Sequence, residues 1–511
     1  MHRERNNRGF QTNTLTGGHN SSLHRCLPNV LLGLSTFVSI TAKGPFQWPI
    51  IGNLRFIRKL SLQYRGQHQA FIELSRRYSS NLISIRLGRS SIIVVSGFEN
   101  IQKVFTSEVF DGRPWNEFIK LRNMGLKKGI TMADGPEWRT VRAWLVRSLR
   151  RIGFGRVDMS ASLLEELQII FEIAKDGGVF CMKSLISMAT INVIWTLIAG
   201  KRISNEKKLQ HFLEMMKRRA EAFDMAGGLL SMFPWVRYVA PKASGYNLLV
   251  TLNDELKSFL KQEIDEHKKN YTPGKTDGDL IDLFLEEIYE RKTDSSIFNE
   301  DQLFIILLDL LIAGLVTTSV TLEFVFLRVT VHQEVQRRLH EELDRVIGRE
   351  RLPELKDRPN LPYAAAVLTE SQRMQMVLPI VGPRRAWSRT HLGGYDIPKD
   401  SYLLLNVFSV FMNPKYYPEP DSFKPERFLK DGSFVHDEKL VFFGAGHRRC
   451  PGEAEAKSVL FLFFVGIMHR FQLLPKPGEG PPDTEPSQGL VISPKPYESL
   501  FVPRQRIDNS A

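Results

Sequence analysis

The segment Phe443-Gly-Ala-Gly-His-Arg-Arg-Cys-Pro-Gly452 surrounds one cysteine, Cys450, with glycines and arginines. The apolar stretch Ser458–Phe471 follows it and predicts a helix, which places Cys450 close to a helix N-terminus. Backbone N–H groups and the helix dipole stabilise a thiolate there, and glycine lets a loop approach a flat cofactor closely. Taken alone, the segment is also compatible with a nucleophilic cysteine or a buried thiol.

The spacing Phe-x-x-Gly-x-Arg-x-Cys-x-Gly resembles the haem-binding loop of cytochromes P450, and every fixed position of that pattern is filled. The resemblance implies that Cys450 ligates the iron of a haem b through a thiolate. An arginine in such a loop can pair with a cofactor carboxylate. The loop residues expected to contact the cofactor are Phe443, Gly446, Arg448 and Gly452.

A Glu-x-x-Arg pair, Glu370 and Arg373, precedes this loop, and its spacing puts both side chains on one face of a helix. Such a pair usually belongs to a solvated helix face. Together with Arg427, in Pro425-Glu-Arg-Phe428, and in this chain order, it resembles the structural Glu-Arg-Arg network behind the haem of the same family.

Three further residues resemble family contacts to the haem propionates. Trp138 and Arg142 are four residues apart, so an indole N–H and a guanidinium point the same way from one helix. Arg384, in Pro383-Arg-Arg-Ala386, stands where many relatives place a histidine that contacts a propionate.

The stretch Gln302–Leu327 predicts the longest apolar helix of the chain, and Asp309 is the one charged residue between Leu303 and Leu315. A helix that is apolar all round is buried in the core of a large protein. The 13 residues of its most apolar part are fewer than the about 20 that a membrane span needs.

Within this helix, Ala313-Gly314-Leu-Val316-Thr317 resembles the family segment that crosses the distal face of the haem. The resemblance implies that Ala313 and Gly314 loosen the helix where dioxygen is activated, and that the Thr317 hydroxyl assists this step. Val316 departs from the pattern, because most relatives carry an acid there that helps to deliver protons. Two interpretations remain open: water and substrate groups replace the acid, or the enzyme is leaky or catalyses redox-neutral chemistry.

The substrate pocket is expected to include Ile306 and Leu310, which share one helix face with Ala313 and Thr317. This apolar set suits a lipid or a terpenoid. Packing in the core explains each of these residues equally well. The family pattern adds Phe118, Met124, Leu378, Val381, Leu490 and Val491.

The 511 residues contain no linker, repeat or low-complexity tract, which favours one large domain. Helical patterns run from about Trp138 to Arg373, and short strand patterns lie on either side. We therefore predict a mainly α fold with small β-sheets, the cytochrome P450 fold, with a catalytic domain over residues 44–505 and a tail at 506–511. Residues 1–43 are expected to form a short or atypical membrane anchor, because the apolar run Val30–Ile40 has only 11 residues.

The chain carries 69 Lys and Arg against 56 Asp and Glu, a net charge of +13, which favours acidic partners. No zinc-finger, RNA-recognition or basic-zipper pattern accompanies this charge, so we expect no nucleic acid but a membrane surface or an acidic protein. Arginines around Cys450 and on the Trp138 helix predict a docking face for an acidic reductase. The apolar segment Leu229–Tyr238 offers a second membrane contact. Three cysteines are too few for a disulfide framework, and a reducing compartment fits.

The family resemblance covers about Gly44 to Arg504 and implies a monooxygenase that inserts one atom of O2 into an apolar substrate. Its electrons would come from NADPH through cytochrome P450 reductase, with cytochrome b5 as a further partner, at the cytoplasmic face of the endoplasmic reticulum. The stretches Phe110–Trp115, Gly129–Gly135 and Gly153–Gly155 are similar to arthropod microsomal P450s near the methyl farnesoate epoxidases, which implies epoxidation or hydroxylation of a farnesoid in juvenile hormone synthesis. The alternatives are a redox-neutral isomerase or dehydratase and a haem or lipid carrier without turnover.

Overall fold

The computed structural model describes residues 42–49, 51–88, 90–153, 160–222, 230, 233–274, 278–290, 295–487 and 491–504. These residues belong to the second of the two units into which the chain divides, Thr41–Ala511. The fold is mainly helical with small β-sheets, which confirms the predicted class.

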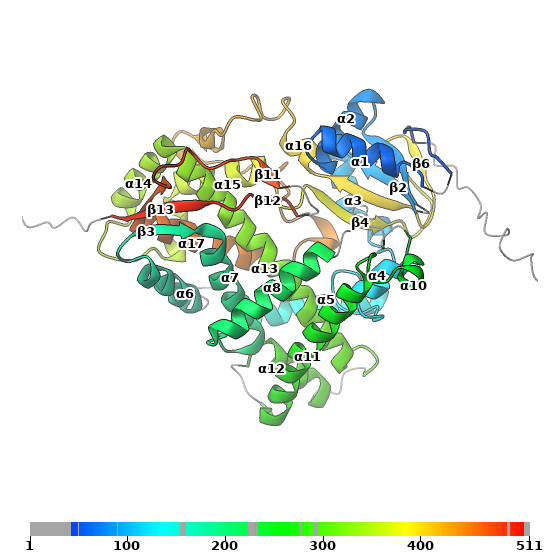
Figure 1. The fold of residues 1–511 in the computed structure, drawn as a ribbon, viewed down its shortest axis with the longest axis horizontal. Helices are drawn as coiled ribbons and strands as arrows, with labels where there is room; N and C mark the ends of the chain where they lie inside the picture. Colours follow the sequence, from blue (N-terminus) through cyan, green and yellow to red (C-terminus); the bar gives the residue numbers. More distant parts are fainter. Residues whose placement is uncertain are drawn as a thin grey trace, which may run out of the picture. The chain divides into compact units, whose positions relative to one another are not determined.

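The long helix α13 (Glu300–Val331) organises the helical part of the fold, where Figure 1 shows it between its neighbours. The Asn299 side chain caps its start by accepting a hydrogen bond from the Gln302 N–H at 3.2 Å. Helix α7 (Met182–Ala199) packs along it. By length and composition both helices could cross a membrane, but 67% of each apolar window is buried, as expected for core helices.

Two large apolar clusters meet along α13. One joins the C-terminal half of α13 to α6 (Ser160–Ile173), α15 (Pro362–Met374) and α17 (Glu453–Arg470). The other joins its N-terminal half to α5 (Gly135–Arg151) and α12 (Leu280–Tyr289). The middle of α13, which carries the Ala313–Thr317 segment, therefore lies where the two clusters adjoin.

A four-stranded sheet has the order β1-β2-β7-β4. Strand β1 (Leu82–Leu87) pairs antiparallel with β2 (Ser90–Val95), which pairs parallel with β7 (Tyr402–Asn406). Strand β4 (Ile380–Arg385) lies antiparallel to β7, with a register shift between Val381 and Arg384. Strands β1 and β2 confirm the short strand patterns expected before the helical region. Arg384, at the end of this shift, is buried.

A three-stranded sheet, β10-β13-β3, joins the end of the chain to its middle: β13 (Glu498–Pro503) lies between β10 (Phe471–Pro475) and β3 (Gly178–Cys181). Three two-stranded sheets pair β5 (Thr390–Leu392) with β6 (Tyr395–Ile397), β8 (Leu429–Lys430) with β9 (Ser433–Phe434), and β11 (Pro486–Ser487) with β12 (Ser493–Pro494). The remaining α-helices are α1 (Leu54–Gln63), α2 (Gln67–Arg77), α3 (Phe98–Thr106), α4 (Glu117–Arg122), α8 (Glu206–Ala222), α10 (Val236–Val239), α11 (Tyr246–Asn270), α14 (Gln333–Val346) and α16 (Phe408–Phe411). The 3-10 helices are η1 (Glu108–Phe110), η3 (Leu355–Asn360), η4 (Pro425–Phe428) and η5 (Gly446–Arg448).

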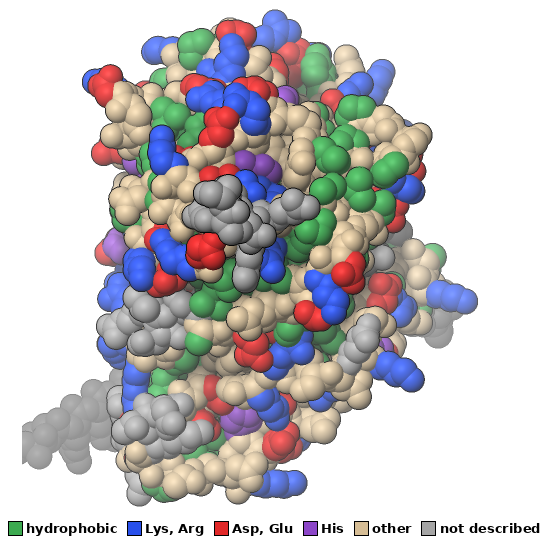
Figure 2. Space-filling view, turned by 90° about the vertical axis from the view of Figure 1, so that its left-hand side faces the viewer, with side chains coloured by type: hydrophobic (Ala, Val, Ile, Leu, Met, Phe, Trp, Pro, Cys, Tyr) green, Lys and Arg blue, Asp and Glu red, His purple; other side chains and the backbone are tan. Residues whose placement is uncertain are grey.

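The surface in Figure 2 mixes basic and acidic side chains. Among the described residues, charged side chains on neighbouring helical turns form ion pairs, as Arg337 does with Glu334 at 2.7 Å. The positive net charge of the chain is therefore not gathered into one patch on this face.

Candidate active site

The loop around Cys450 ends where α17 begins, three residues later, with Gly452 as the N-cap. The Cys450 N–H donates to the Phe443 carbonyl at 2.9 Å, which closes the loop. The Cys450 side chain is exposed, yet burial of its sulfur among neighbouring groups raises the pKa of the thiol, while the Gly452 N–H and Arg142 oppose this rise. A thiolate here needs a cationic partner, and a bound iron provides one.

Two loop glycines lie against the end of α3. A Cβ on Gly446 would be 2.0 Å from the Phe105 carbonyl oxygen, and the φ of Gly446 is +67°. Gly444 has a similar φ of +69°, but a Cβ there would meet only the Phe105 ring at 3.5 Å. Gly446 therefore permits a close approach of two backbone segments that no other residue allows.

The loop arginine Arg448 lies on the Trp138 ring, with its guanidinium carbon 3.5 Å from the ring centroid. Its Nε and Nη2 donate to the Asp111 carbonyl at 3.0 and 2.7 Å. The Trp138 indole donates to the Ile130 carbonyl at 3.1 Å. Arg142 lies on the same side of α5 as Trp138, as predicted, and donates to the Arg449 carbonyl.

Arg384 and Arg113 extend this basic group. Arg384 is buried, with Nη1 3.1 Å from the Asp111 carboxylate, and Arg113 Nη1 donates to the Pro383 carbonyl at 2.6 Å. The Nε atoms of both arginines are buried and have no hydrogen-bond partner among the described residues. Burial lowers the pKa of Arg384 to about 10 and lowers that of Arg113 well below its usual value.

These arginines fit the two carboxylates of a haem, because guanidinium groups withdrawn from water bind carboxylates strongly. Burial, and then Arg384, lower the pKa of Arg448 to about 9, so an anionic ligand would stabilise the charged form of the group. Sequence reasoning missed Arg113, although it lies in the Phe110–Trp115 stretch. Its position directly before Pro114 in the sequence does not indicate that its side chain is buried.

The small residues in the middle of α13 lie in two different surroundings. Ala313 is exposed and Thr317 is half-buried, with its hydroxyl donating to the Ala313 carbonyl at 2.7 Å. A Cβ on Gly314 would be 2.8 Å from Ile194 Cδ1, so Gly314 permits the close packing of α7 on α13. Val316 packs against both apolar clusters. The residue that replaces the usual acid thus belongs to the core side of the helix.

The residues expected to line the substrate pocket divide into three groups. Leu310 and Met124 are half-buried and pack against the cluster around the N-terminal half of α13, whereas Ile306 is fully buried and offers no surface to a substrate. Phe118 is buried in a separate cluster with Leu230 and Leu249. The half-buried residues Leu378, Val381 and Val491 lie in segments joined by the bond from the Ile492 N–H to the Val377 carbonyl, 3.1 Å long, and Leu490 lies outside the described residues.

Glu370, Arg373 and Arg427 are brought together by α15 and η4. Glu370 and Arg373 have no exposed surface and form a two-bonded pair at 2.7 and 2.9 Å. Arg427 Nε donates to the same carboxylate at 3.1 Å. Arg373 also donates to the carbonyls of Phe411 and Pro420. The group ties α15 to η4 and to the segment before it.

A model of the cytochrome P450 family matches residues 42–501. The chain is a cytochrome P450. It is 37% identical over 474 residues to "Probable cytochrome P450 305a1" of Drosophila melanogaster and 35% identical over 466 residues to "Farnesoate epoxidase" of Bombyx mori, covering 90% of this chain and 94% of the relative in each case. It is 33% identical over 509 residues to "Cytochrome P450 2U1" of Mus musculus, covering 94% of both chains.

Membership of the family makes this P450 a haem-thiolate monooxygenase, and the bound haem supplies the activation of dioxygen. We propose Cys450 as its ligand, the loop residues with Trp138, Arg142 and Arg384 as its contacts, and Arg113 as an addition to them. In this proposal the chain would position the thiolate and neutralise the carboxylates, and α13 would present Ala313 and Thr317 beside the site.

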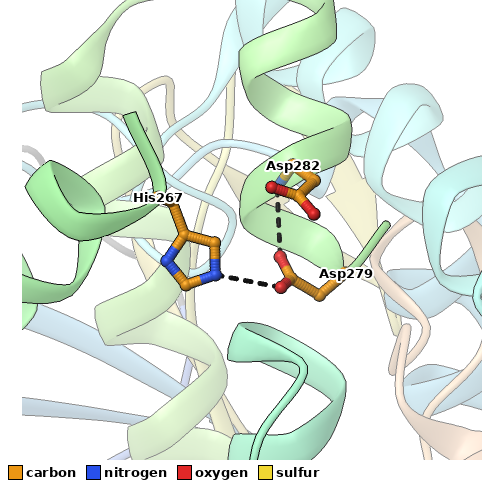
Figure 3. A group of neighbouring side chains, drawn as sticks. All are labelled: His267, Asp279 and Asp282. Atoms are coloured by element: carbon orange, nitrogen blue, oxygen red, sulfur yellow. Dashed lines mark hydrogen bonds and ion pairs between the residues drawn. The ribbon is translucent and has the colours of Figure 1, made fainter. Parts of the chain in front are cut away.

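Apart from this site, His267, Asp279 and Asp282 carry ligand-type atoms within 4.8 Å of one another (Figure 3). His267 Nε2 lies 2.9 Å from Asp279 Oδ2, and Asp279 Oδ1 accepts from the Asp282 N–H at 3.0 Å as the N-cap of α12. His267 Nδ1 bonds the Glu263 carbonyl at 2.9 Å. Both imidazole nitrogens are thus engaged, and the group is an ion pair that caps a helix.

Proposed function

We propose that this P450 inserts oxygen into a terpenoid, by epoxidation or hydroxylation of methyl farnesoate, with electrons from NADPH through cytochrome P450 reductase. The observation that carries the proposal is the small-residue face of α13 at Ala313 and Thr317, about one helical turn from the apolar Leu310. Such a surface suits an apolar chain with few polar groups. The similarity to a protein named farnesoate epoxidase supports the same substrate class.

Exposed arginines support docking of an acidic reductase on the Cys450 side. Arg147 and Arg150 of α5 are exposed and form no ion pair within the described part of the chain. Arg139 and Arg449 are exposed too but are paired with Glu108 and Glu453. Unpaired surface charges steer an opposite partner more effectively than paired ones do. Cytochrome b5 would use the same face.

Membrane association at the cytoplasmic face of the endoplasmic reticulum completes the proposal. The side chains Phe46 and Trp48 are 75% and 60% exposed, and Trp235, Tyr238 and Val239 are 61%, 75% and 75% exposed. Large exposed apolar groups of this kind suit the interface of a bilayer. We further propose the residue 1–43 segment as the anchor and residues 44–505 as the catalytic domain. Recovery of the full-length protein only in the soluble fraction after lysis would refute the membrane assignment.

The decisive experiment is NADPH-driven turnover of the haem-loaded protein with a reductase and methyl farnesoate, measuring oxygenated product and peroxide per NADPH. Product close to one per NADPH would establish the reaction, and a reaction without reductase gives the background. No oxygenated product, from a protein that still forms the thiolate-type complex with CO, would refute this substrate.

A second candidate is a redox-neutral isomerase or dehydratase, favoured by Val316 in place of the usual acid. This activity would convert its substrate without NADPH and reductase. The variant Val316→Glu separates the two: in a monooxygenase with a weak proton supply it would lower the peroxide fraction, with Val316→Gln as the uncharged control. In a redox-neutral enzyme, the rate of substrate conversion would not change with the peroxide yield of either variant.

A further inference from the structure

The first turn of α17 carries two carboxyl groups in different surroundings. Glu453 is paired with Arg449 at 2.5 Å and with Lys457 at 2.7 Å. Glu455 is half-buried, its Oε1 atom is buried without a hydrogen-bond partner, and it forms no ion pair within the described part of the chain. A carboxyl group withdrawn from water without a partner is costly to ionise, and burial raises the pKa of Glu455 to about 8.

The position of Glu455 in the helix explains why it lacks a partner. Gly452 is the N-cap of α17, so Glu455 is the third helical residue. From that position a glutamate side chain commonly bonds back to the N–H of the N-cap residue. Here the Gly452 N–H bonds the Cys450 sulfur instead. The sulfur has therefore taken the donor that a glutamate at this position would use.

Glu455 lies close enough to Cys450 for their charges to interact. Cys450 and Gly452 are two residues apart, which is at most about 7 Å, and Gly452 and Glu455 are about 5 Å apart on one helix face. Burial raises the pKa of the Cys450 thiol, the Gly452 N–H opposes this rise, and Glu453 and Glu455 add to it. The free Oε1 of Glu455 acts on the sulfur through space, and its negative charge disfavours further negative charge there.

We propose that Glu455, acting through the Cys450 thiolate, lowers the reduction potential of the haem iron, and that this carboxylate takes up a proton when the iron is reduced. The inference rests on Cys450 as the iron ligand and goes beyond the proposed function, because it depends on no particular substrate. One electron from the reductase adds a negative charge at the iron and its thiolate, and one proton from water neutralises Glu455. A charged carboxylate nearby opposes the added electron, whereas a neutral carboxyl group does not.

The direction of the effect with pH follows from the Glu455 carboxyl group. Well below pH 8 the group is neutral and opposes reduction little, and well above pH 8 it is charged and lowers the potential. Arg448, with a pKa of about 9 set by burial and then Arg384, changes its charge in part of the same range, so wild type and variant are compared at each pH. The other charged groups beside the loop and the first turn of α17 are Arg142, His447, Arg449, Glu453 and Lys457.

The test is a spectroelectrochemical titration of the haem-loaded protein, which follows the haem absorption spectrum without substrate or reductase. At about pH 9, Glu455→Gln should raise the equilibrium constant for reduction about tenfold, which corresponds to about 59 mV for one electron. At about pH 6.5 the potentials of wild type and variant should agree. Glu455→Asp should keep part of the dependence on pH, and Glu455→Leu repeats the removal with an apolar side chain. Each variant is first checked for the thiolate-type complex with CO.

Glu453→Gln is the matched control, because Glu453 belongs to the same turn but is ion-paired. Burial opposes its ionisation, but Arg449 and then Lys457 outweigh burial and lower the pKa of Glu453. Its substitution should therefore change the potential equally at pH 6.5 and pH 9. An equal difference between wild type and Glu455→Gln at the two pH values, or no difference at either, would overturn the proposal.

This inference and the proposed function fail in different ways. If methyl farnesoate is not oxygenated, but the potential of the wild type falls with pH in a way that Glu455→Gln abolishes, the substrate is wrong and the inference stands. If methyl farnesoate is oxygenated, but wild type and Glu455→Gln have the same potentials at both pH values, the inference is wrong and the proposed function stands.

Discussion

The carbonyl oxygen of Phe105 lies 2.0 Å from the point where a side chain on Gly446 would begin. The end of α3 therefore determines how the Cys450 loop passes the site, and the loop can lie there only with glycine at position 446. Backbone atoms cannot rotate out of the way as a side chain can. The contact could therefore be relieved only if the backbone of α3 or of the loop moved.

The first prediction follows from this contact. Gly446→Ala should displace the loop and reduce the haem content of the purified protein by about tenfold or more, which corresponds to about 1.4 kcal/mol of haem affinity. Gly444→Ala is the matched control, since its φ is also positive but its Cβ would meet the Phe105 ring at an ordinary 3.5 Å. The ratio of haem absorbance to protein measures both. Normal haem content in Gly446→Ala would show that the end of α3 can move away from residue 446, which would contradict this prediction.

Cys450→Ser should remove the thiolate that we propose as the iron ligand. The variant is expected to retain some haem through the arginine group but to lose the thiolate-type spectrum of the CO complex. Cys181→Ser is the control, because Cys181 lies in β3 and is a free, half-buried thiol. Its spectrum should match the wild type. A thiolate-type spectrum in Cys450→Ser would assign the ligand elsewhere.

Glu370→Gln should destabilise the protein through the buried arginines that it leaves unpaired. Glu370 and Arg373 have no exposed surface, and removing one partner of a buried pair costs about 3–5 kcal/mol. The loss appears as a lower midpoint of denaturation in urea. Glu334→Gln, which breaks an exposed pair with Arg337, should leave that midpoint unchanged. Equal effects of the two variants would contradict the structural role of Glu370.

Whether a residue of this site can be predicted depends on whether its sequence pattern lies within a few neighbouring residues. The Cys450 loop, the Glu370 pair and the α13 segment each carry their spacing within a few residues, so both the mainly α fold and these groups follow from the sequence. Arg113 does not, because its burial depends on Pro383, a residue 270 positions away that approaches through the four-stranded sheet. Ile306 was expected in the pocket for its helix face alone, but the apolar cluster around the N-terminal half of α13 buries it completely.

The contact between Gly314 and Ile194 gives a prediction about packing. Gly314→Ala would place a Cβ 2.8 Å from Ile194 Cδ1 and should destabilise the protein by about 1–3 kcal/mol. Ile194→Val removes that Cδ1 atom and should recover most of the loss in the double variant. Urea denaturation of the two single variants and the double variant measures the coupling. Additive losses would show that α7 does not limit the residue at 314.

The His267–Asp279 pair predicts a dependence of stability on pH. Burial opposes protonation of His267, but Asp279 and then the Glu263 backbone outweigh it and raise the pKa to about 9. A pKa raised from 6.5 contributes stability that is fully present below about pH 6.5 and is lost as the pH rises through about 9. The difference in unfolding free energy between wild type and His267→Gln should therefore shrink across that range. Further charged groups beside His267 are Glu263 with its partner Lys201, Asp282 and Glu266.

His340→Gln provides the control for this titration, since burial lowers the pKa of His340 to about 4 and that imidazole is neutral throughout the range. Its effect on stability should stay constant from about pH 7.5 to 9, because the folded imidazole and the unfolded imidazole, with its ordinary pKa of 6.5, are both neutral there. A chelator should leave both curves unmoved if the His267 group is the ion pair that its hydrogen bonds indicate. A fall in the unfolding midpoint on chelation, abolished in His267→Gln, would instead identify the group as a cation site.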